Sequence, residues 1–130
     1  MPPINRVLIA LLCGASIAAA DAQDVAEFYA NRTLTILVGS GAGGTTDTTA
    51  RAIARYFDRH IPGQPNVIVV NMPGGGSATM ANHIFRSAPR DGSTLGYSLP
   101  GIITAQLLEP GRARFDGREL NWIGSALKYT

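Results

Sequence analysis

The chain has 130 residues, of which 45% are hydrophobic and 15% are charged. This length allows one modest domain, and the composition supports a packed core and argues against general disorder. The formal net charge of +2 is too small to indicate a nucleic-acid-binding surface. The arginines are also not interleaved with aromatic residues, as base-stacking surfaces require. We therefore expect a folded protein without a nucleic-acid partner.

The N-terminus has the pattern of a secretory signal peptide. Residues 1–6 form a basic start, and residues 7–20 form an apolar run that ends in small residues suited to signal peptidase. The run is shorter than the roughly 20 residues that a membrane span needs, so a retained membrane anchor is the weaker alternative. We predict a signal peptide at residues 1–22, with the mature chain starting near Asp21 or Gln23.

Cys13, the only cysteine, lies inside this apolar run. A lipoprotein site requires a small residue before the cysteine, but Leu12 stands there. The mature chain, residues 23–130, is then expected to have no disulfide and no thiolate chemistry.

The first predicted unit is a strand, a glycine-rich loop and a helix. Leu34–Val38 is an apolar run ended by glycine, as expected for a strand buried on both faces. After the loop Gly39–Gly44, Thr45 or Thr46 is the expected helix cap, and Pro62 ends the helix. The expected buried face of this helix consists of Ala50, Ile53, Ala54, Phe57 and Ile61, and Arg51, Arg55 and Arg59 form an expected solvated stripe.

The second unit repeats this order. Val67–Val70 predicts another buried strand, Asn71–Gly76 another glycine-rich loop, and Ser77 the cap of a second helix. The expected buried face of that helix consists of Ala78, Ala81, Phe85 and Ala88. The expected later elements are a turn at Pro89–Gly92, a strand at Thr94–Ser98, a short helix at Ile103–Leu108 and a further strand near Trp122–Gly124, with Trp122 in the core.

Strands that alternate with helices at this spacing predict an α/β fold with a mostly parallel sheet and flanking helices. Ligands of such sheets lie beyond the carboxyl ends of the strands, and both glycine-rich loops follow a strand directly. The chain stops after an apolar segment without a closing helix. We therefore expect a fragment of a larger fold.

The two loops suit an anion. Glycine permits positive φ and removes side chains, so backbone N–H groups can converge on a ligand, and the N-terminus of a helix adds unpaired N–H groups. Neither loop contains lysine or arginine, which favours a weakly charged anion such as a carboxylate. The plainer alternative is that each loop is only a tight β–α turn.

Other functional classes fit less well. Gly39, Gly41 and Gly44 match the dinucleotide-binding pattern, so a Rossmann-like enzyme domain is the main rival, but Asn71 stands where that motif has an acidic residue. No Gly-Lys-Ser/Thr follows either loop, which excludes a phosphate-loop NTPase. His60 and His83 have no partner motif, so we expect no metal site. Without a nucleophile elbow around Ser40 or Ser77, we also expect no hydrolase.

Three ordered motifs resemble one family. Leu34–Asp47, a strand and glycine run followed by Thr-Asp, resembles the first signature of the Bug family, the periplasmic receptors of tripartite tricarboxylate transporters. Asn71–Ser77 resembles that family's second loop, and Pro89–Leu95 resembles its Pro-Asp-Gly-Tyr-Thr-Leu turn, with Ser93 in place of tyrosine. The resemblance extends from about residue 33 to residue 127.

This resemblance implies the first lobe of a type II periplasmic-binding-protein-like, two-lobed fold. It implies a non-enzymatic, cofactor-free receptor that captures a small organic carboxylate and works with membrane components of a transporter. The first loop departs from the family because Gly41-Ala42 stands where a proline usually precedes the glycines. The second lobe is not expected within residues 23–130, so a non-functional remnant is a further alternative. The candidate ligand-binding residues are Ser40, Gly43, Gly44, Thr45 and Asp47 in the first loop, Asn71, Gly74, Gly75, Gly76 and Ser77 in the second, and Ser98 and Gly101 after the third strand.

Overall fold

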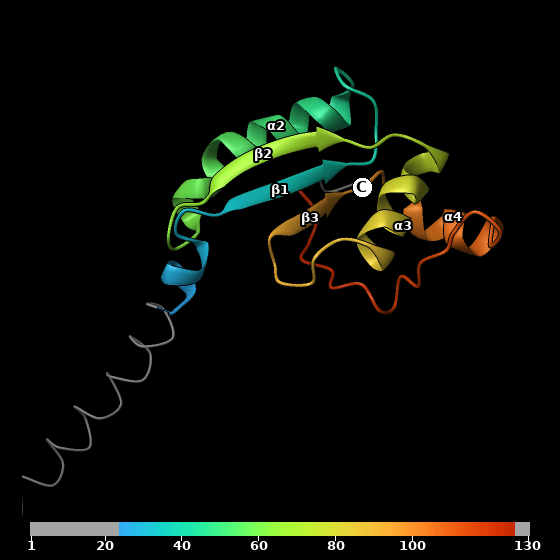
Figure 1. The fold of residues 1–130 in the computed structure, drawn as a ribbon. Coiled ribbons are helices and arrows are strands. Elements are labelled where there is room, and N and C mark those ends of the chain that lie inside the picture. Colours follow the sequence, from blue (N-terminus) through green and yellow to red (C-terminus); the bar gives the residue numbers. More distant parts are fainter. Residues whose placement is uncertain (1–23, 127–130) are drawn as a thin grey trace, which may run out of the picture.

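The computed structural model describes residues 24–126, so the predicted signal peptide and its cleavage sites lie outside the described residues. Residues 24–29 are helical. The elements that follow are β1 (Thr33–Val38), α2 (Thr45–Phe57), the 3-10 turn η1 (Asp58–His60), β2 (Asn66–Asn71), the 3-10 turn η2 (Gly75–Ser77), α3 (Ala78–Arg86), β3 (Thr94–Tyr97) and α4 (Ile102–Leu108) (Figure 1). The predicted α/β fold is confirmed.

The three strands form one open parallel sheet in the order β2-β1-β3. The chain leaves β1 towards β2 through α2, and then crosses back past β1 to β3 through α3. Because parallel crossovers are right-handed, two crossovers in opposite directions place their helices on opposite faces of the sheet. Figure 1 shows this arrangement, with α2 behind the sheet and α3 in front of it.

Apolar side chains on one face of the sheet pack against α2. Ile36 and Val38 of β1 and Ala50 of α2 are buried together, and Val67, Val69, Ala54, Phe57 and Tyr97 pack around them. Alternate residues of a strand point to opposite faces, so β1 presents every second side chain to α2. The predicted packing of Ala50, Ala54 and Phe57 on this helix is thereby confirmed.

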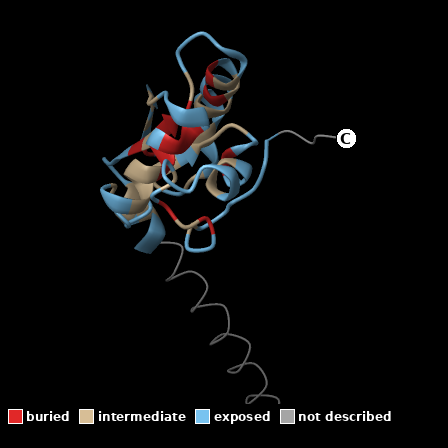
Figure 2. Cartoon of the chain, turned by 90° about the vertical axis from the view of Figure 1, so that its right-hand side faces the viewer, coloured by how far each residue is buried: buried red, intermediate tan, exposed pale blue. Residues whose placement is uncertain are grey.

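A second cluster joins α3 and α4 to the C-terminal segment. Ala78, Ala81, Ile102 and Phe115 are buried in it, and Phe85 packs against it. A Cβ atom on Gly96 of β3 would lie 2.5 Å from Ile84 Cδ1, so α3 packs directly on the glycine backbone of this strand. Figure 2 shows the buried residues gathered in the middle of the molecule, with exposed loops around them.

The prediction that β2 is buried on both faces is wrong. Val67 and Val69 pack under α2, but Ile68 and Val70 are 40% and 41% exposed. β2 lies at one edge of the sheet, and α3 packs on β3 at the other side. A continuous apolar run therefore does not distinguish a central strand from an edge strand with one uncovered face.

Four local predictions also need correction. The α-helix α2 ends at Phe57 rather than at Pro62, because residues 58–60 tighten into η1. The helix α3 ends at Arg86, before Ala88. The residues 121–125 form no strand. Trp122 is 55% exposed rather than in the core, and its indole Nε1 donates to Gly117 O at 2.7 Å.

Among the helices of residues 24–126, none combines the length and apolar character that a membrane span needs.

Candidate functional site

The register of the sheet brings three loops to one edge. Val38, at the end of β1, pairs with Asn71, at the end of β2, and also with Tyr97, at the end of β3. The three strands therefore end at the same level, and each is followed by a segment that contains predicted site residues. These segments join the sheet to the N-termini of α2, α3 and α4 at the edge where parallel sheets bind ligands.

Asp47 is the centre of a hydrogen-bond network in the first loop. Its side chain is 4% exposed, and its carboxylate accepts the Gly43 N–H at 2.8 Å, the Arg51 Nε–H at 3.0 Å and the Asn71 Nδ2–H at 2.9 Å. Asn71 Nδ2 also donates to Ser40 O at 3.1 Å. Four of the predicted site residues, Ser40, Gly43, Asp47 and Asn71, are thus held together, and Asp47 joins the first loop to the end of β2.

This network lowers the pKa of Asp47 from 3.8 to about 2. The hydrogen bond from Arg51 contributes most, followed by those from the Gly43 N–H and the Asn71 amide, while burial opposes them. These donors stabilise the ionised form, so the carboxylate remains charged well below the usual range of an aspartate.

We expect acid to weaken the loop through Asp47. Because its pKa is lower in the folded state, its stabilising contribution is present above about pH 4 and is lost as the pH falls towards 2. Urea unfolding of the wild type and Asp47→Asn should therefore show a clear difference at pH 5 that narrows towards pH 2.5. Asp24→Asn removes an exposed carboxylate and is the control. A difference between the wild type and Asp47→Asn that does not change with pH would contradict the assignment.

Arg51 belongs to this network, which corrects the prediction that it lies on a purely solvated stripe. Besides Asp47, its Nη2 donates to Asn71 Oδ1 at 2.8 Å, while its side chain remains 46% exposed. The sequence contained a signal for it, since Asp47 and Arg51 are four residues apart on one helix. The prediction that the loops lack a cation considered only the loop residues and missed this one.

The N-terminus of α2 has no side-chain cap. Gly44, rather than Thr45 or Thr46, is the N-cap residue, and no side chain accepts from the first turn. The N–H groups of a first helical turn have no partner within the helix. Ser40 Oγ, close by in the chain, is buried and has no hydrogen-bond partner in the part of the chain that the structure describes. The loop therefore offers unpaired donors beside the Asp47 network.

The second loop has a strongly left-handed backbone. Gly74, Gly75 and Gly76 have φ values of 133°, 54° and 62°, and Ser77 follows with φ 82°. Glycine adopts such values without strain, whereas serine does not. The run turns the chain sharply from β2 into α3.

Ser77 connects the loops to one another. It is fully buried, and its hydroxyl donates to Gly39 O at 3.1 Å and accepts the Leu99 N–H at 2.9 Å. Although Ser77 occupies the N-cap position of α3, its side chain makes no capping hydrogen bond. The predicted capping role is therefore wrong, and its hydroxyl instead joins the ends of β1 and β3.

The remaining predicted site residues lie after β3. Ser98 follows the end of this strand directly, and Gly101 is the N-cap residue of α4. The helix α4 packs near η2, so this third segment borders the second glycine loop. The structure thus brings all three predicted segments to one edge of the sheet. Contact between their residues and a ligand stays a prediction.

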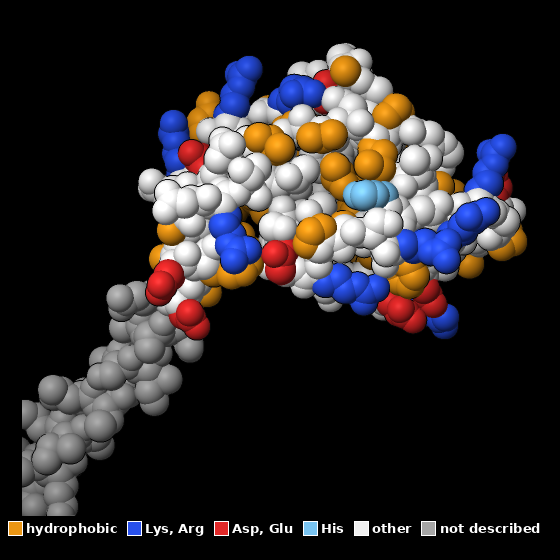
Figure 3. Space-filling model, viewed as in Figure 1, with side chains coloured by type: hydrophobic (Ala, Val, Ile, Leu, Met, Phe, Trp, Pro, Cys, Tyr) orange, Lys and Arg blue, Asp and Glu red, His pale blue; other side chains and the backbone are white. Residues whose placement is uncertain are grey.

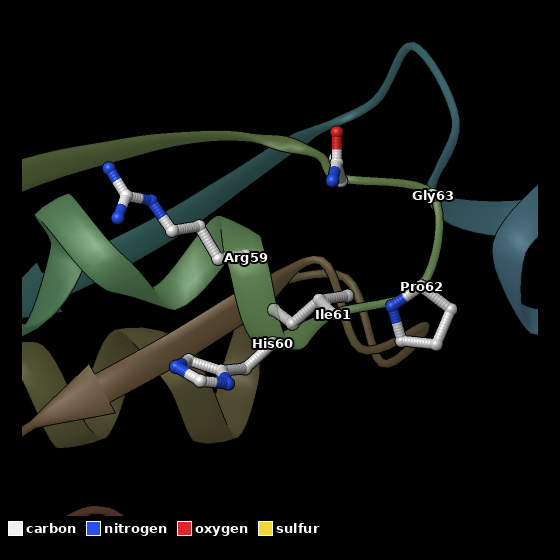
Figure 4. Close-up of a pocket in the computed structure, with 6 residues that line it drawn as sticks. Arg59, His60, Ile61, Pro62 and Gly63 are labelled. Carbon is white, nitrogen blue, oxygen red and sulfur yellow. The ribbon is translucent and has the colours of Figure 1, made fainter.

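The surface has two further hollows, one remote from this edge and one that reaches Gly75 of the second glycine loop. One, of about 520 Å³, is lined by the contiguous residues 59–64 at the turn before β2, and Figure 4 shows Arg59 and His60 on different sides of that turn. All of its lining residues belong to one continuous segment, which contains none of the predicted site residues. The other, of about 690 Å³, lies beside α3. Within residues 24–126, no cluster of three or more His, Cys, Asp or Glu side chains could hold a metal ion.

Comparison with known proteins identifies two similar sequences. The chain is 34% identical over 112 residues to the UPF0065 protein in the TAR-I ttuE-ttuC' intergenic region of Agrobacterium vitis, a match that covers 85% of this chain and 31% of that protein. It is 40% identical over 79 residues to the UPF0065 protein in the gbd 5' region of Cupriavidus necator, which covers 61% of this chain and 23% of that protein. No family model matches the chain.

The chain therefore spans about a third or less of the length of these curated relatives. Their shared description, UPF0065, denotes the Bug family, which the three sequence motifs also resemble. The chain is thus a homologue of UPF0065 proteins, and this relationship supports its placement in the Bug family.

Proposed function

We propose that the chain is part of a periplasmic, non-enzymatic solute receptor that holds a small organic carboxylate at the edge where the three strands end. The ligand would lie between the two glycine-rich loops. The receptor would pass it to the membrane components of a tripartite tricarboxylate-type transporter, and it would need no cofactor. We further propose that the chain is exported by its signal peptide, and that residues 23–130 form the first lobe of a type II two-lobed protein.

One observation carries this proposal. The pairing of Val38 with both Asn71 and Tyr97 aligns the ends of the strands, so two loops with few side chains face the same space. The homology to UPF0065 proteins supports the receptor class. The N-termini of α2 and α3 add the positive end of each helix dipole, which favours an anion.

The hydrogen bonds indicate which groups would contact the ligand. The Gly43 N–H and the Asp47 carboxylate are occupied by each other, so they would shape the loop rather than bind the ligand. The better donors are the backbone N–H groups of Gly44, Thr45, Gly75 and Gly76. Arg51 places a partly exposed cation beside them. Backbone N–H groups beside one partly exposed guanidinium suit a carboxylate ligand.

The same network disfavours the dinucleotide-binding alternative. At the end of β2, that class needs a free acidic side chain for the ribose hydroxyls. The side chain here is the amide of Asn71, which donates to Asp47 and Ser40 O and accepts from Arg51. It has neither the charge nor the free acceptor for that role.

Amide chemical shifts of the 15N-labelled chain would test the carboxylate site. We expect succinate or citrate to shift the amide signals of Gly44, Thr45, Gly75 and Gly76, with saturation in the millimolar range or above. Each solvent-exposed hydrogen bond contributes only about 1 kcal/mol, and three or four of them barely offset the entropy of association. Sodium chloride at equal ionic strength is the salt control, and NAD tests the rival function.

A side chain at the start of α2 should block this binding. Gly44 has an ordinary φ of −76°, and the nearest atom to an added Cβ would be Gly41 O at 3.7 Å. Gly44→Val should therefore fold and weaken the carboxylate response at least tenfold, while Gly111→Val, outside both loops, should leave it unchanged. Shifts spread evenly over the surface, an unaffected Gly44→Val variant, or saturable NAD binding at the loops would overturn the proposal.

A further inference from the structure

A basic hollow lies between α3 and the segment that follows α4. It is open to solvent and has a volume of about 690 Å³. One wall is the outer side of α3 and the other is the segment around residues 111–114. The lining residues are Gly75, Ala78, Thr79, Asn82, His83, Arg86, Ser87, Gly111, Arg112 and Arg114. Among them, only Gly75 belongs to the proposed carboxylate site.

The second wall is held in place by Asn82. Its Nδ2 donates to Arg112 O at 3.0 Å, and its Oδ1 accepts the Arg114 N–H at 2.7 Å. The segment then continues to Phe115, which is buried in the cluster with Ala78 and Ala81 of α3. Two hydrogen bonds and a buried aromatic ring thus fix the backbone that carries Arg112 and Arg114, so little ordering would be needed when a ligand binds.

The charge of the hollow is entirely positive. Arg86, Arg112 and Arg114 line it, and no lining residue is acidic. Arg112 forms an ion pair with Glu109 at 2.9 Å. Within residues 24–126, the guanidinium groups of Arg86 and Arg114 have no hydrogen-bond or ion-pair partner. Figure 3 shows basic side chains gathered at the right-hand side of this face, over the end of the molecule where α3 and α4 lie.

We propose that this hollow binds an acidic segment of a partner protein. Guanidinium groups recognise carboxylates through paired N–H donors, and those of Arg86 and Arg114 have no partner among residues 24–126. The hollow is open to solvent along its length, so an extended segment could lie in it. The Thr79 side chain and the backbone of Gly111 add polar groups to the lining, with which the main chain of a peptide could form hydrogen bonds. The proposal does not depend on the carboxylate site in the glycine loops.

A fluorescein-labelled hexaglutamate peptide would test this inference. We expect its fluorescence anisotropy to rise when the full chain is added at low salt, and its affinity to fall steeply as salt is raised. The double variant Arg86→Gln/Arg114→Gln should weaken binding at least tenfold. The matched control is Arg55→Gln/Arg59→Gln, which removes two exposed arginines from α2 and η1 and should change the affinity less than twofold.

Three outcomes would overturn the inference. The first is the absence of peptide binding by the wild-type chain. The second is an equal loss in both double variants while circular dichroism shows both folded, because it would indicate attraction by net charge alone. The third is displacement of the peptide by inorganic phosphate at micromolar concentration, which would indicate a small-anion site. Succinate at concentrations that shift the loop amides should not displace the peptide, which separates this surface from the carboxylate site.

Discussion

Replacing Gly39 with valine should lower the free energy of unfolding by at least about 3 kcal/mol, and it should abolish cooperative folding if the chain is only marginally stable. Gly39 follows β1 and its N–H donates to Tyr97 O at 3.0 Å. A Cβ atom there would lie 2.3 Å from Ser77 Oγ, 2.4 Å from Ser77 Cβ and 3.0 Å from Ser77 Cα. Because Ser77 is fully buried and its backbone begins α3, neither residue can move aside without separating the loops.

Gly41→Val is the matched control for this prediction. Gly41 lies two residues further along the same loop, and an added Cβ would meet no atom within 4 Å. We expect its effect on the unfolding free energy to stay within about 0.5 kcal/mol. Urea denaturation followed by circular dichroism measures both variants. Equal effects of the two substitutions would show that the close approach of Gly39 to Ser77 does not exist in solution.

Replacing Ser77 with alanine should destabilise the chain by about 2–4 kcal/mol. The hydroxyl joins Gly39 O and the Leu99 N–H, so the substitution would leave a buried carbonyl and a partly buried N–H without this partner. A buried polar group without a partner costs about 1–3 kcal/mol, and two such groups are affected. Because Ser77 links the ends of β1 and β3, the substitution should also broaden the amide signals of the neighbouring loops.

Ser77→Gly separates the hydroxyl from the backbone strain. It removes the same two hydrogen bonds, but glycine adopts the φ of 82° without a Cβ penalty. We therefore expect Ser77→Gly to be less destabilising than Ser77→Ala by about 1 kcal/mol. If Ser77→Ala unfolds at the same urea concentration as the wild type, the hydroxyl does not join the strands as described.

Much of the fold follows from local patterns. Neighbours in the chain are enough to recognise the apolar runs of β1 and β2 and the glycines that follow them. The same holds for the helical spacing of Ala50, Ala54 and Phe57. Alternation of these units then requires a parallel sheet, since two such strands can only be joined by a crossover. This reasoning also placed the two glycine loops at one edge, and the register of Val38 with Asn71 and Tyr97 agrees with it.

The roles of the side chains in the loops could be assigned only from the tertiary structure. Ser77 has the residue type and position of a helix cap, yet its hydroxyl bonds to Gly39 O, which is 38 residues away in the chain. Asn71 reaches Ser40 O and Asp47 only because β1 and β2 are neighbours in the sheet. Long-range partners of this kind leave no periodic signal in the sequence.

Burial was also decided by the tertiary arrangement. The residues of β2 are all apolar from Val67 to Val70, but α2 covers only one face of this edge strand, so Ile68 and Val70 remain exposed. Trp122 is exposed because the segment after Phe115 runs over the surface. The sequence by itself determined the alternation of strands and helices and the sites of the glycine turns, because these depend on local conformational preference. Which faces are covered, which donors are paired and which arginines line one hollow depend on contacts between distant segments, and only the packed chain brings those segments together.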